Sequence, residues 1–218
     1  MSVSISFLGA TETVTGSRFL IDSSGEKILV DAGLFQGIRD IRKRNAAPFP
    51  IPPKDIKAVV LTHAHLDHSG FLPVLVKNGF TGPIYATKYG AKLAEIVLHD
   101  SAHIHEGDSH SEGDEPLYNA DDVTKTIALF KIVEFRKNIS IAENISVTFY
   151  PSGHILGSAF LEIVAAGKRL VFTGDMGRNG HPLLVDPDNP PNSQIDALIT
   201  ESTYGDRLHD NDIDKFVT

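Results

Sequence analysis

Apolar and polar residues alternate at the start of the chain, a pattern typical of a half-buried β-strand. Val3, Ile5 and Phe7 stand between Ser4 and Ser6, and residues two apart in a strand point to the same face of the sheet. Further short apolar runs, bounded by turn-forming or charged residues, predict strands over Phe19–Ile21, Ile28–Val30, Ala58–Leu61, Ile145–Phe149, Ala159–Val164, Arg169–Phe172 and Ala197–Ile199. Strands are therefore expected toward both ends of the chain.

Helical spacing of apolar residues occurs in the middle of the chain. Leu93, Ile96 and Val97 have this spacing in a segment that begins near Lys88, so a helix is predicted there. The stretch Glu106–Pro116 that follows is polar and acidic and contains two glycines. We interpret it as an exposed loop and not as a domain boundary.

A second helix is predicted after Asn119, which is a favourable N-cap residue. Asp121 and Asp122 lie in its first turn, where acidic side chains stabilise a helix. Its expected apolar face consists of Val123, Ile127 and Phe130. Strands, then helices, then strands again predict an α/β or α+β fold in which sheets and helices form stacked layers.

Composition favours a single soluble domain. The 218 residues are 41% hydrophobic and 22% charged, which excludes a disordered or fibrous chain and fits one large globular domain. Polar residues interrupt every apolar run well short of a bilayer span, and the N-terminus lacks the basic segment of a signal peptide. We therefore expect a cytoplasmic protein with no membrane partner.

Charge and cysteine content narrow the chemistry. Twenty basic and 28 acidic residues give a net charge of −8, the wrong sign for a domain that binds nucleic acid over a broad basic face. Any polyanion would have to be held locally. The absence of cysteine excludes disulfides, a thiolate nucleophile and sulfur ligands to zinc. A metal ion would have to be held by histidine and carboxylate side chains.

A dense group of such side chains follows the predicted strand Ala58–Leu61. Directly after Thr62 come His63, His65, Asp67 and His68. His63 and His65 can converge on one ion because residues two apart in an extended segment point to the same side. The turn that follows can direct Asp67 and His68 toward a second ion. A histidine-rich surface loop is the alternative, but four ligand-type residues at this spacing favour a site of the kind zinc prefers.

This run resembles the HxHxDH signature of the metallo-β-lactamase superfamily. Three further loops of that family are matched in order, each after a predicted strand, by Asp31 in LVDAG, His154 in SGHILGS and Asp175 in FTGDM. Taken alone, each would be an ordinary turn, core or capping residue. Their order and their positions after strands carry the resemblance.

Within the superfamily, the chain is similar to the β-CASP branch of RNA-processing nucleases. The runs GHILGS, residues 153–158, and Glu201–Gly205, ESTYG, carry this similarity. The branch includes nucleases of the ribonuclease J type and the pre-mRNA 3′-end processing endonuclease. The resemblance extends from Phe7 to Arg207 and therefore covers nearly the whole chain.

The resemblance implies the αββα sandwich of the metallo-β-lactamases. Residues 1–200 would form the catalytic domain, and residues 201–218 would begin the segment that leads into a β-CASP domain. Asn211–Thr218 begins a capped helix and stops within roughly two turns, so we expect the protein to continue beyond Thr218. The two later histidine motifs of the family are not matched here, since neither His181 nor His209 lies in a similar motif.

The resemblance also implies how two metal ions would be held. The first zinc site would consist of His63, His65 and His154. The second would use Asp67 and His68, and Asp175 would bridge the pair. Asp31 would accept a hydrogen bond from a ligand imidazole and so fix its tautomer. We therefore expect two Zn²⁺ ions as cofactors, with Mn²⁺ as the alternative.

Phosphodiester hydrolysis needs a nucleophile at neutral pH and neutralisation of the phosphoryl charge, and two divalent ions supply both. We therefore expect a zinc-dependent ribonuclease that cleaves single-stranded RNA with a metal-activated water. Its catalytic residues would be Asp67, Asp175 and Glu201. Glu201 matches a family carboxylate that shares proton transfer to the leaving oxygen with a histidine from a later segment. Its structural alternative is a cap on the Ser202–Thr203 turn.

Other interpretations remain open at this point. A second group, His99, His103, His105 and His110, is interpreted as structural, since polar helices at a solvent edge commonly carry such residues. A small-molecule hydrolase of the same fold, of thioesterase or lactonase type, is disfavoured by the run Glu201–Gly205. An inactive scaffold subunit is disfavoured because every ligand that the resemblance places within these 218 residues is present. Endonuclease or exonuclease action, RNA or DNA preference, sequence preference and oligomeric state are left open.

Overall fold

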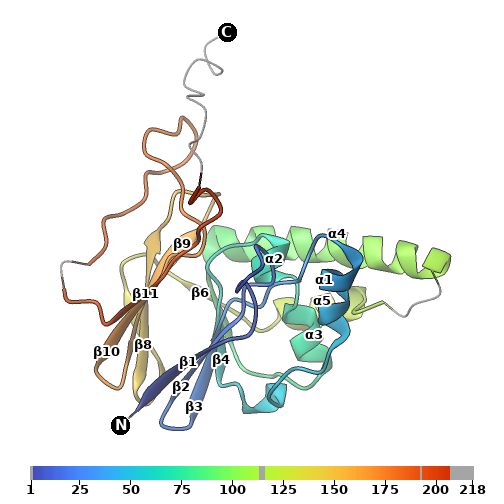
Figure 1. Ribbon diagram of the computed structural model, residues 1–218, viewed down its shortest axis with the longest axis horizontal. Coiled ribbons are helices and arrows are strands. Elements are labelled where there is room, and N and C mark those ends of the chain that lie inside the picture. The colour runs from blue at the N-terminus through green and yellow to red at the C-terminus, as the bar shows by residue number, and fades with distance from the viewer. Residues whose placement is uncertain (1, 113–115, 192, 207–218) are drawn as a thin grey trace.

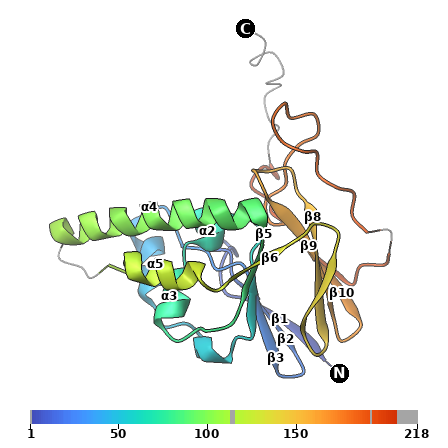
Figure 2. The same ribbon diagram turned by 180° about the vertical axis from the view of Figure 1, so that it is seen from behind.

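The computed structural model describes residues 2–112, 116–191 and 193–206. Two β-sheets face one another, and helices cover the outer face of the first sheet (Figure 1 and Figure 2). The predicted α/β architecture of stacked layers is therefore confirmed. In the described residues the helical layer lies on one side of the sandwich.

The first sheet has six strands in the order in which they follow one another along the chain. They are β1 (Val3–Phe7), β2 (Phe19–Ser23), β3 (Glu26–Val30), β4 (Ala58–Val60), β5 (Ile84–Thr87) and β6 (Phe130–Val133). The pairs β1–β2 and β2–β3 are antiparallel, and the pairs from β3 to β6 are parallel. The carboxyl ends of the four parallel strands therefore lie at one edge of the sheet.

The second sheet has five strands in the order β11-β10-β9-β8-β7. They are β7 (Asn138–Ala142), β8 (Ile145–Pro151), β9 (Ala159–Ala165), β10 (Lys168–Phe172) and β11 (Ala197–Ile199). All pairs are antiparallel except β10–β11, which is parallel. Because of this pairing, β8, β10 and β11 run in the same direction and end at the same edge.

The helices vary widely in length. They are α1 (Arg39–Arg42), α2 (Leu66–Ser69), α3 (Leu72–Lys77), α4 (Lys88–Glu112) and α5 (Ala120–Ile127), with 3-10 turns η1 (Lys43–Ala46) and η2 (Pro53–Asp55). Asn119 caps α5 as predicted, since its side chain accepts from the Asp122 backbone and Asp122 reciprocates. No helix among the described residues combines the length and apolar character that a bilayer crossing requires.

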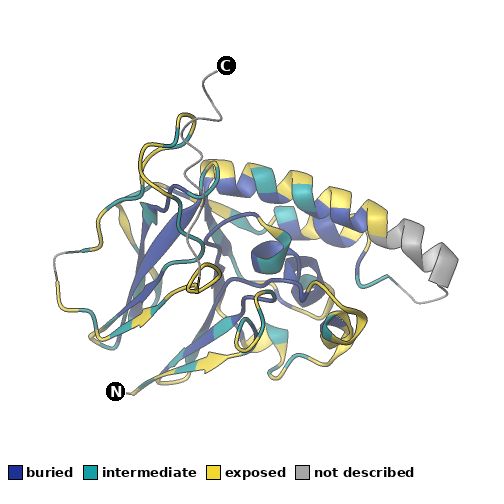
Figure 3. Cartoon of the chain, turned by 45° about the horizontal axis from the view of Figure 1, so that its top comes forward, coloured by how far each residue is buried: buried dark blue, intermediate teal, exposed yellow. Residues whose placement is uncertain are grey.

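Two apolar clusters hold the layers together, and the central strands contribute to both. Leu29 and Val59 pack on the helical side, whereas Ile28, Val30 and Val60 pack between the sheets. Successive residues of a strand point to opposite faces, so a strand covered on both faces is apolar at every position. Figure 3 shows buried segments in the strands of both sheets, whereas many of the loops are exposed.

Some predictions of secondary structure were wrong. The stretch from Glu106 was expected to be a loop, but α4 continues to Glu112. No proline interrupts residues 88–115, and polar composition reports on exposure and not on the end of a helix. Phe130 was placed on the face of the second helix but begins β6, because α5 ends at Ile127. The predicted helix at residues 211–218 lies outside the described residues.

Candidate metal centre

The predicted ligand residues lie in loops that follow strands of both sheets. Asp31 follows β3, the segment from His63 to His68 follows β4, His154 follows β8 and Asp175 follows β10. The turn predicted after His65 is the single helical turn α2. The ends of these strands meet at one edge of the sandwich, so residues more than a hundred positions apart come together.

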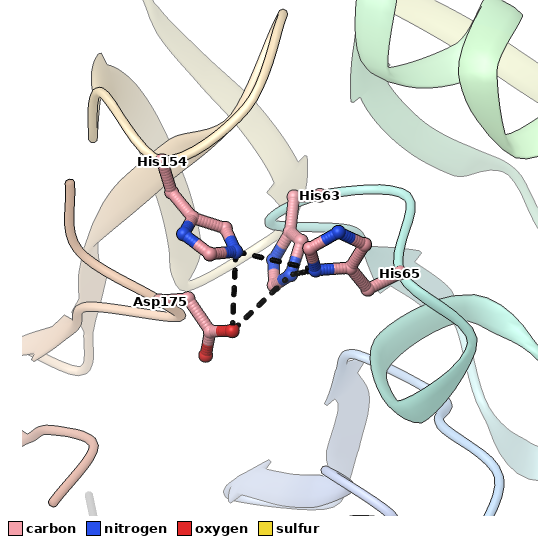
Figure 4. Close-up of side chains that lie close together, drawn as sticks. All are labelled: His63, His65, His154 and Asp175. Atoms are coloured by element: carbon pink, nitrogen blue, oxygen red, sulfur yellow. Dashed lines mark hydrogen bonds and ion pairs between the residues drawn. The ribbon is translucent and has the colours of Figure 1, made fainter. Parts of the chain in front are cut away.

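Four of these side chains converge on one point (Figure 4). His65 Nδ1 lies 3.1 Å from His63 Nε2 and 3.2 Å from His154 Nε2. Asp175 Oδ2 lies 3.4 Å from His154 Nε2 and 3.6 Å from His63 Nε2. We call His63, His65, His154 and Asp175 the three-histidine group.

The spacing of these four atoms fits a metal ion. In a tetrahedral zinc site with metal–ligand bonds of about 2.0–2.1 Å, neighbouring ligand atoms lie about 3.3–3.4 Å apart. The four contacts given above, from 3.1 to 3.6 Å, lie on either side of this value, and all four ligand atoms lie within 4.8 Å of one another. Three imidazoles and one carboxylate are also a donor set that zinc accepts. The residues present therefore fit the cation that the donor chemistry implies.

A second set of potential ligands lies beside the first. His68 Nε2 is 3.3 Å from Asp175 Oδ1 and 3.9 Å from Asp67 Oδ2, and Ser17 Oγ lies 3.3 Å from the same nitrogen. We call Asp67, His68 and Asp175 the His68 group. Asp175 thus directs one carboxylate oxygen to each group, which is the geometry that a bridging ligand requires.

Asp31 is buried and binds the ring of His68. Its Oδ2 lies 2.7 Å from His68 Nδ1 and accepts a hydrogen bond of 2.7 Å from Thr62 Oγ1. Its Oδ1 accepts from the Thr62 backbone N–H at 2.7 Å. The backbone of Asp31 is in the left-handed region, at φ 55°, which aspartate tolerates better than most residues. These contacts place the Asp31 carboxylate within hydrogen-bond distance of the His68 ring, and the role of His68 as a metal ligand stays a prediction.

The surroundings of the histidines set their charge. Burial, followed by the neighbouring rings of His68, His65 and His154, holds the pKa of His63 well below its ordinary value. The pKa of His154 is also lowered, chiefly by burial. Neutral imidazole is the form that binds a metal ion.

The His68 group has the opposite balance. Burial alone would lower the pKa of His68, but the carboxylates of Asp31 and Asp175 raise it to about 10. Burial would raise the pKa of Asp175, yet the hydrogen bond and charge of His68 hold it below its ordinary value. The site is therefore rich in negative charge, which a cation would balance.

A cavity of about 540 Å³ opens beside the His68 group. Its described lining includes five carboxylates and no lysine or arginine, the carboxylates being those of Glu12, Asp31, Asp175, Glu201 and Asp206. Phe19 and Phe172 lie on its apolar side. Because an acidic cavity repels anions, a bound cation would be needed before an anionic group could enter.

Glu201 lies just beyond β11 and lines this cavity. Its Oε1 accepts a hydrogen bond of 2.8 Å from the backbone N–H of Met176. The carboxylate therefore holds the loop that carries Asp175. Its proposed part in proton transfer stays a prediction.

The described members of the second group of histidines, His99 and His103, do not join the site. His99 and His103 are exposed on α4, and the side chains of His105 and His110 lie outside the described residues. His181 accepts a hydrogen bond at Nδ1 from the Leu183 backbone, and His209 lies outside the described residues.

Sequence reasoning did not identify Ser17 or Thr62. Thr62 directly precedes His63 at the end of a predicted strand. A hydroxyl at this position could have been predicted to contact the neighbouring ligand residues. The sequence gives no comparable indication for Ser17, because this residue lies 51 positions from His68 in the chain and the two meet only in the folded structure.

Comparison with known families agrees with this arrangement of loops. The family model described as the metallo-beta-lactamase superfamily matches residues 13–212. The chain belongs to the metallo-β-lactamase superfamily. A solved metallo-β-lactamase of this superfamily from Cronobacter sakazakii, the HARLDQ motif mutant S60, aligns with a TM-score of 0.52 and 19% identity over 85% of this chain and 71% of that chain. This likeness supports the fold.

Curated members of the superfamily are closer in sequence. "Ribonuclease TTHA0252" of Thermus thermophilus is 40% identical over 92% of this chain and 44% of its own length. "Endoribonuclease ysh1" of Emericella nidulans is 31% identical over 91% of this chain and 22% of its own length. "Transcription termination factor FttA" of Methanosarcina mazei is 32% identical over 93% of this chain and 32% of its own length.

These relatives confirm the resemblance to the β-CASP branch of RNA-processing nucleases. The chain spans less than half the length of each of these curated relatives. The activity of the whole protein is therefore a matter for a proposal.

Proposed function

We propose that this chain is the catalytic metallo-β-lactamase domain of a metal-dependent ribonuclease that hydrolyses phosphodiester bonds in single-stranded RNA. The observation that carries the proposal is the convergence of two ligand groups on Asp175. The two relatives named as a ribonuclease and an endoribonuclease support the choice of RNA as substrate. In this proposal residues 1–200 form the domain, and residues 201–218 lead toward a β-CASP domain.

The cofactors we propose are two Zn²⁺ ions, with Mn²⁺ as the alternative. The three-histidine group would hold one ion, and the His68 group would hold the other with Asp175 between them. When bound, such a pair lowers the pKa of a water molecule to about 7 and neutralises charge on the phosphoryl oxygens. The donor set supports zinc because all the ligands are imidazoles and carboxylates.

The side chains of the chain itself prepare this chemistry. The Asp67 side chain is 21% exposed, so its carboxylate can accept a proton from solvent water at the site. Asp31 holds the ring of His68 with Nε2 toward Asp175. Glu201 lines the cavity beside them, and we propose that it shares a proton with a histidine from another segment to protonate the leaving oxygen.

The charge of the chain shapes how RNA would bind. The net charge of −8 and the acidic cavity offer no broad basic surface for phosphates. The metal ions would therefore supply the local positive charge, and a further domain would supply the remaining contacts to the RNA phosphates. We propose a cytoplasmic location, as expected for an RNA-processing enzyme.

The test compares the 218-residue chain with the protein encoded by the full gene. Each is assayed by gel on labelled single-stranded RNA with zinc or manganese, and the full protein is also assayed as Asp67→Ala. We expect cleavage by the full protein, little by the 218-residue chain and none by Asp67→Ala. Equal cleavage by both lengths would instead favour a complete small-domain hydrolase. Absence of metal binding after zinc addition would contradict the proposal.

A further inference from the structure

Thr62 lies where four loops of the site meet. The residue is 1% exposed, and its backbone N–H and its hydroxyl both donate to the carboxylate of Asp31 at 2.7 Å. Its carbonyl accepts a hydrogen bond of 2.9 Å from Ala159, which follows the loop of His154. It also packs under Gly174, where an added Cβ would lie 2.8 Å from the Thr62 side chain.

The hydrogen bonds of the Thr62 hydroxyl define where protons must lie. A threonine hydroxyl has one proton, and the ionised Asp31 carboxylate can only accept. The 2.7 Å contact to Asp31 Oδ2 therefore uses the hydroxyl proton. The oxygen of Thr62 then has only acceptor capacity left for His63 Nδ1, which lies 3.1 Å away. His63 must carry its proton on Nδ1.

This tautomer leaves Nε2 of His63 with a free lone pair. Nε2 is the atom that faces His65 and Asp175 in the three-histidine group. His68 is oriented in the same way, because its Nδ1 lies 2.7 Å from Asp31 Oδ2 and 3.5 Å from Thr62 Oγ1. Asp31 therefore sets the orientation of His68 directly, and it can reach His63 only through the Thr62 hydroxyl.

We propose that Thr62 is a positioning residue that carries the influence of Asp31 to His63 and fixes the ring in its metal-binding tautomer. The inference rests on the proposed metal dependence and adds a residue that connects the two ligand groups. Partners that orient ligand imidazoles commonly contribute 10-fold to 100-fold in metal affinity. Thr62 does so without contacting the metal position itself.

A purely structural role for Thr62 would depend on its shape, not on its hydroxyl. Thr62→Val keeps the shape and removes the hydroxyl, whereas Thr62→Ser keeps the hydroxyl and removes the methyl group that packs toward Gly174. Thr126→Val is the matched control, since this hydroxyl is also fully buried but donates to the Asp122 carbonyl in α5.

The first measurement is zinc affinity by competition with a chelator, using zinc alone as the probe. We expect Thr62→Val to weaken zinc binding roughly 10-fold to 100-fold, and Thr62→Ser and Thr126→Val to stay close to wild type. Equal affinity of Thr62→Val and wild type would overturn the inference. Weakening by Thr62→Ser as large as that by Thr62→Val would also overturn it, because packing would then be the cause.

The second measurement is the histidine ring N–H spectrum of the zinc-loaded protein. We expect a low-field, slowly exchanging Nδ1 proton for His63 in wild type and Thr62→Ser, and its loss in Thr62→Val. Absence of this signal from the wild-type protein overturns the inference even if Thr62→Val fails to fold. Failure of the wild-type protein to bind zinc would contradict the proposed function, whereas normal binding by wild type and Thr62→Val contradicts this inference alone.

Discussion

Two histidine-bearing regions of the molecule differ in how their side chains are presented. His63, His65 and His154 come from loops at the ends of strands in two different sheets, and their ring nitrogens meet within hydrogen-bond distance. His99 and His103 come from one long helix, α4, and both are exposed. The number of histidines is similar, but only strand ends from separate layers bring them to a common point.

The physical reason lies in the geometry of the two elements. Residues four apart on a helix have Cβ atoms about 5–6 Å apart and can share one ion, but a helix face supplies few ligands unless a neighbouring element adds more. Within the described ranges, the three-histidine group and the His68 group both form from loops that follow strands, and neither takes a residue from α4. A high density of ligand-type residues in the sequence therefore indicates a metal site less well than the position of such residues after successive strands.

The largest expected difference is in the rate of RNA cleavage, between the variants Asp175→Ala and His103→Ala. Asp175 directs an oxygen to each ligand group, so its loss removes several kcal/mol of charge stabilisation and should reduce RNA cleavage by roughly 10³-fold. His103→Ala changes an exposed side chain and should leave cleavage near wild type. Rates are measured on the protein from the full gene, with thermal unfolding to verify folding. Equal losses in both variants would mean that the helix histidines belong to the active site.

A second contrast concerns zinc binding. His65 contacts both other histidines of its group, so His65→Ala should weaken zinc binding at the three-histidine group by more than about 100-fold. That figure is the upper end of the loss expected when only a residue that orients a ligand is removed. His99→Ala should bind zinc as wild type does. Metal analysis gives the stoichiometry, which we expect to be one to two ions per chain in the wild-type protein. Chelator competition gives the affinity. The comparison would fail if His99→Ala lost an ion that His65→Ala retained.

The smallest expected effect concerns α5, which we expect to contribute to the stability of the fold but not to zinc binding. Asn119→Ala removes the side chain that caps α5 and should lower the free energy of unfolding by about 1 kcal/mol. Zinc affinity should not change, because α5 carries no residue of the three-histidine group or the His68 group. Denaturant unfolding and chelator competition measure the two quantities. A loss of zinc affinity would show that α5 is coupled to the metal centre.

Much of the candidate site was expected because the order of its loops resembles that of the metallo-β-lactamase superfamily. The positions of His154 and Asp175 after apolar runs supported that resemblance, but neither residue could have been placed near His63 from its own position alone. Thr62 and Ser17 could not be identified in this way. Their roles depend on which hydroxyl faces which ring nitrogen, and that depends on loop conformation, such as the left-handed backbone of Asp31.

The fold was predicted less completely for similar reasons. Strands with clear apolar runs, such as Ala159–Ala165, were identified, whereas Asn138–Ala142 was missed because it is exposed or half-buried throughout. The one-turn helix Leu66–Ser69 is too short to have a helical period. Its backbone depends on contacts with other loops, since Leu34 donates to the Leu66 carbonyl.

The ligand loops touch through their backbones, and this has a consequence for mutational tolerance. A Cβ added at Gly33 would lie 1.6 Å from the Asp67 carbonyl oxygen, and one added at Gly177 would lie 1.9 Å from the Gly153 carbonyl oxygen. No side chain of any size fits at either position. In a library of random substitutions these two glycines should be as invariant as the histidines, although neither has a functional group. An engineer who wished to change the metal specificity could therefore replace ligand side chains but could not move one loop without moving its neighbour.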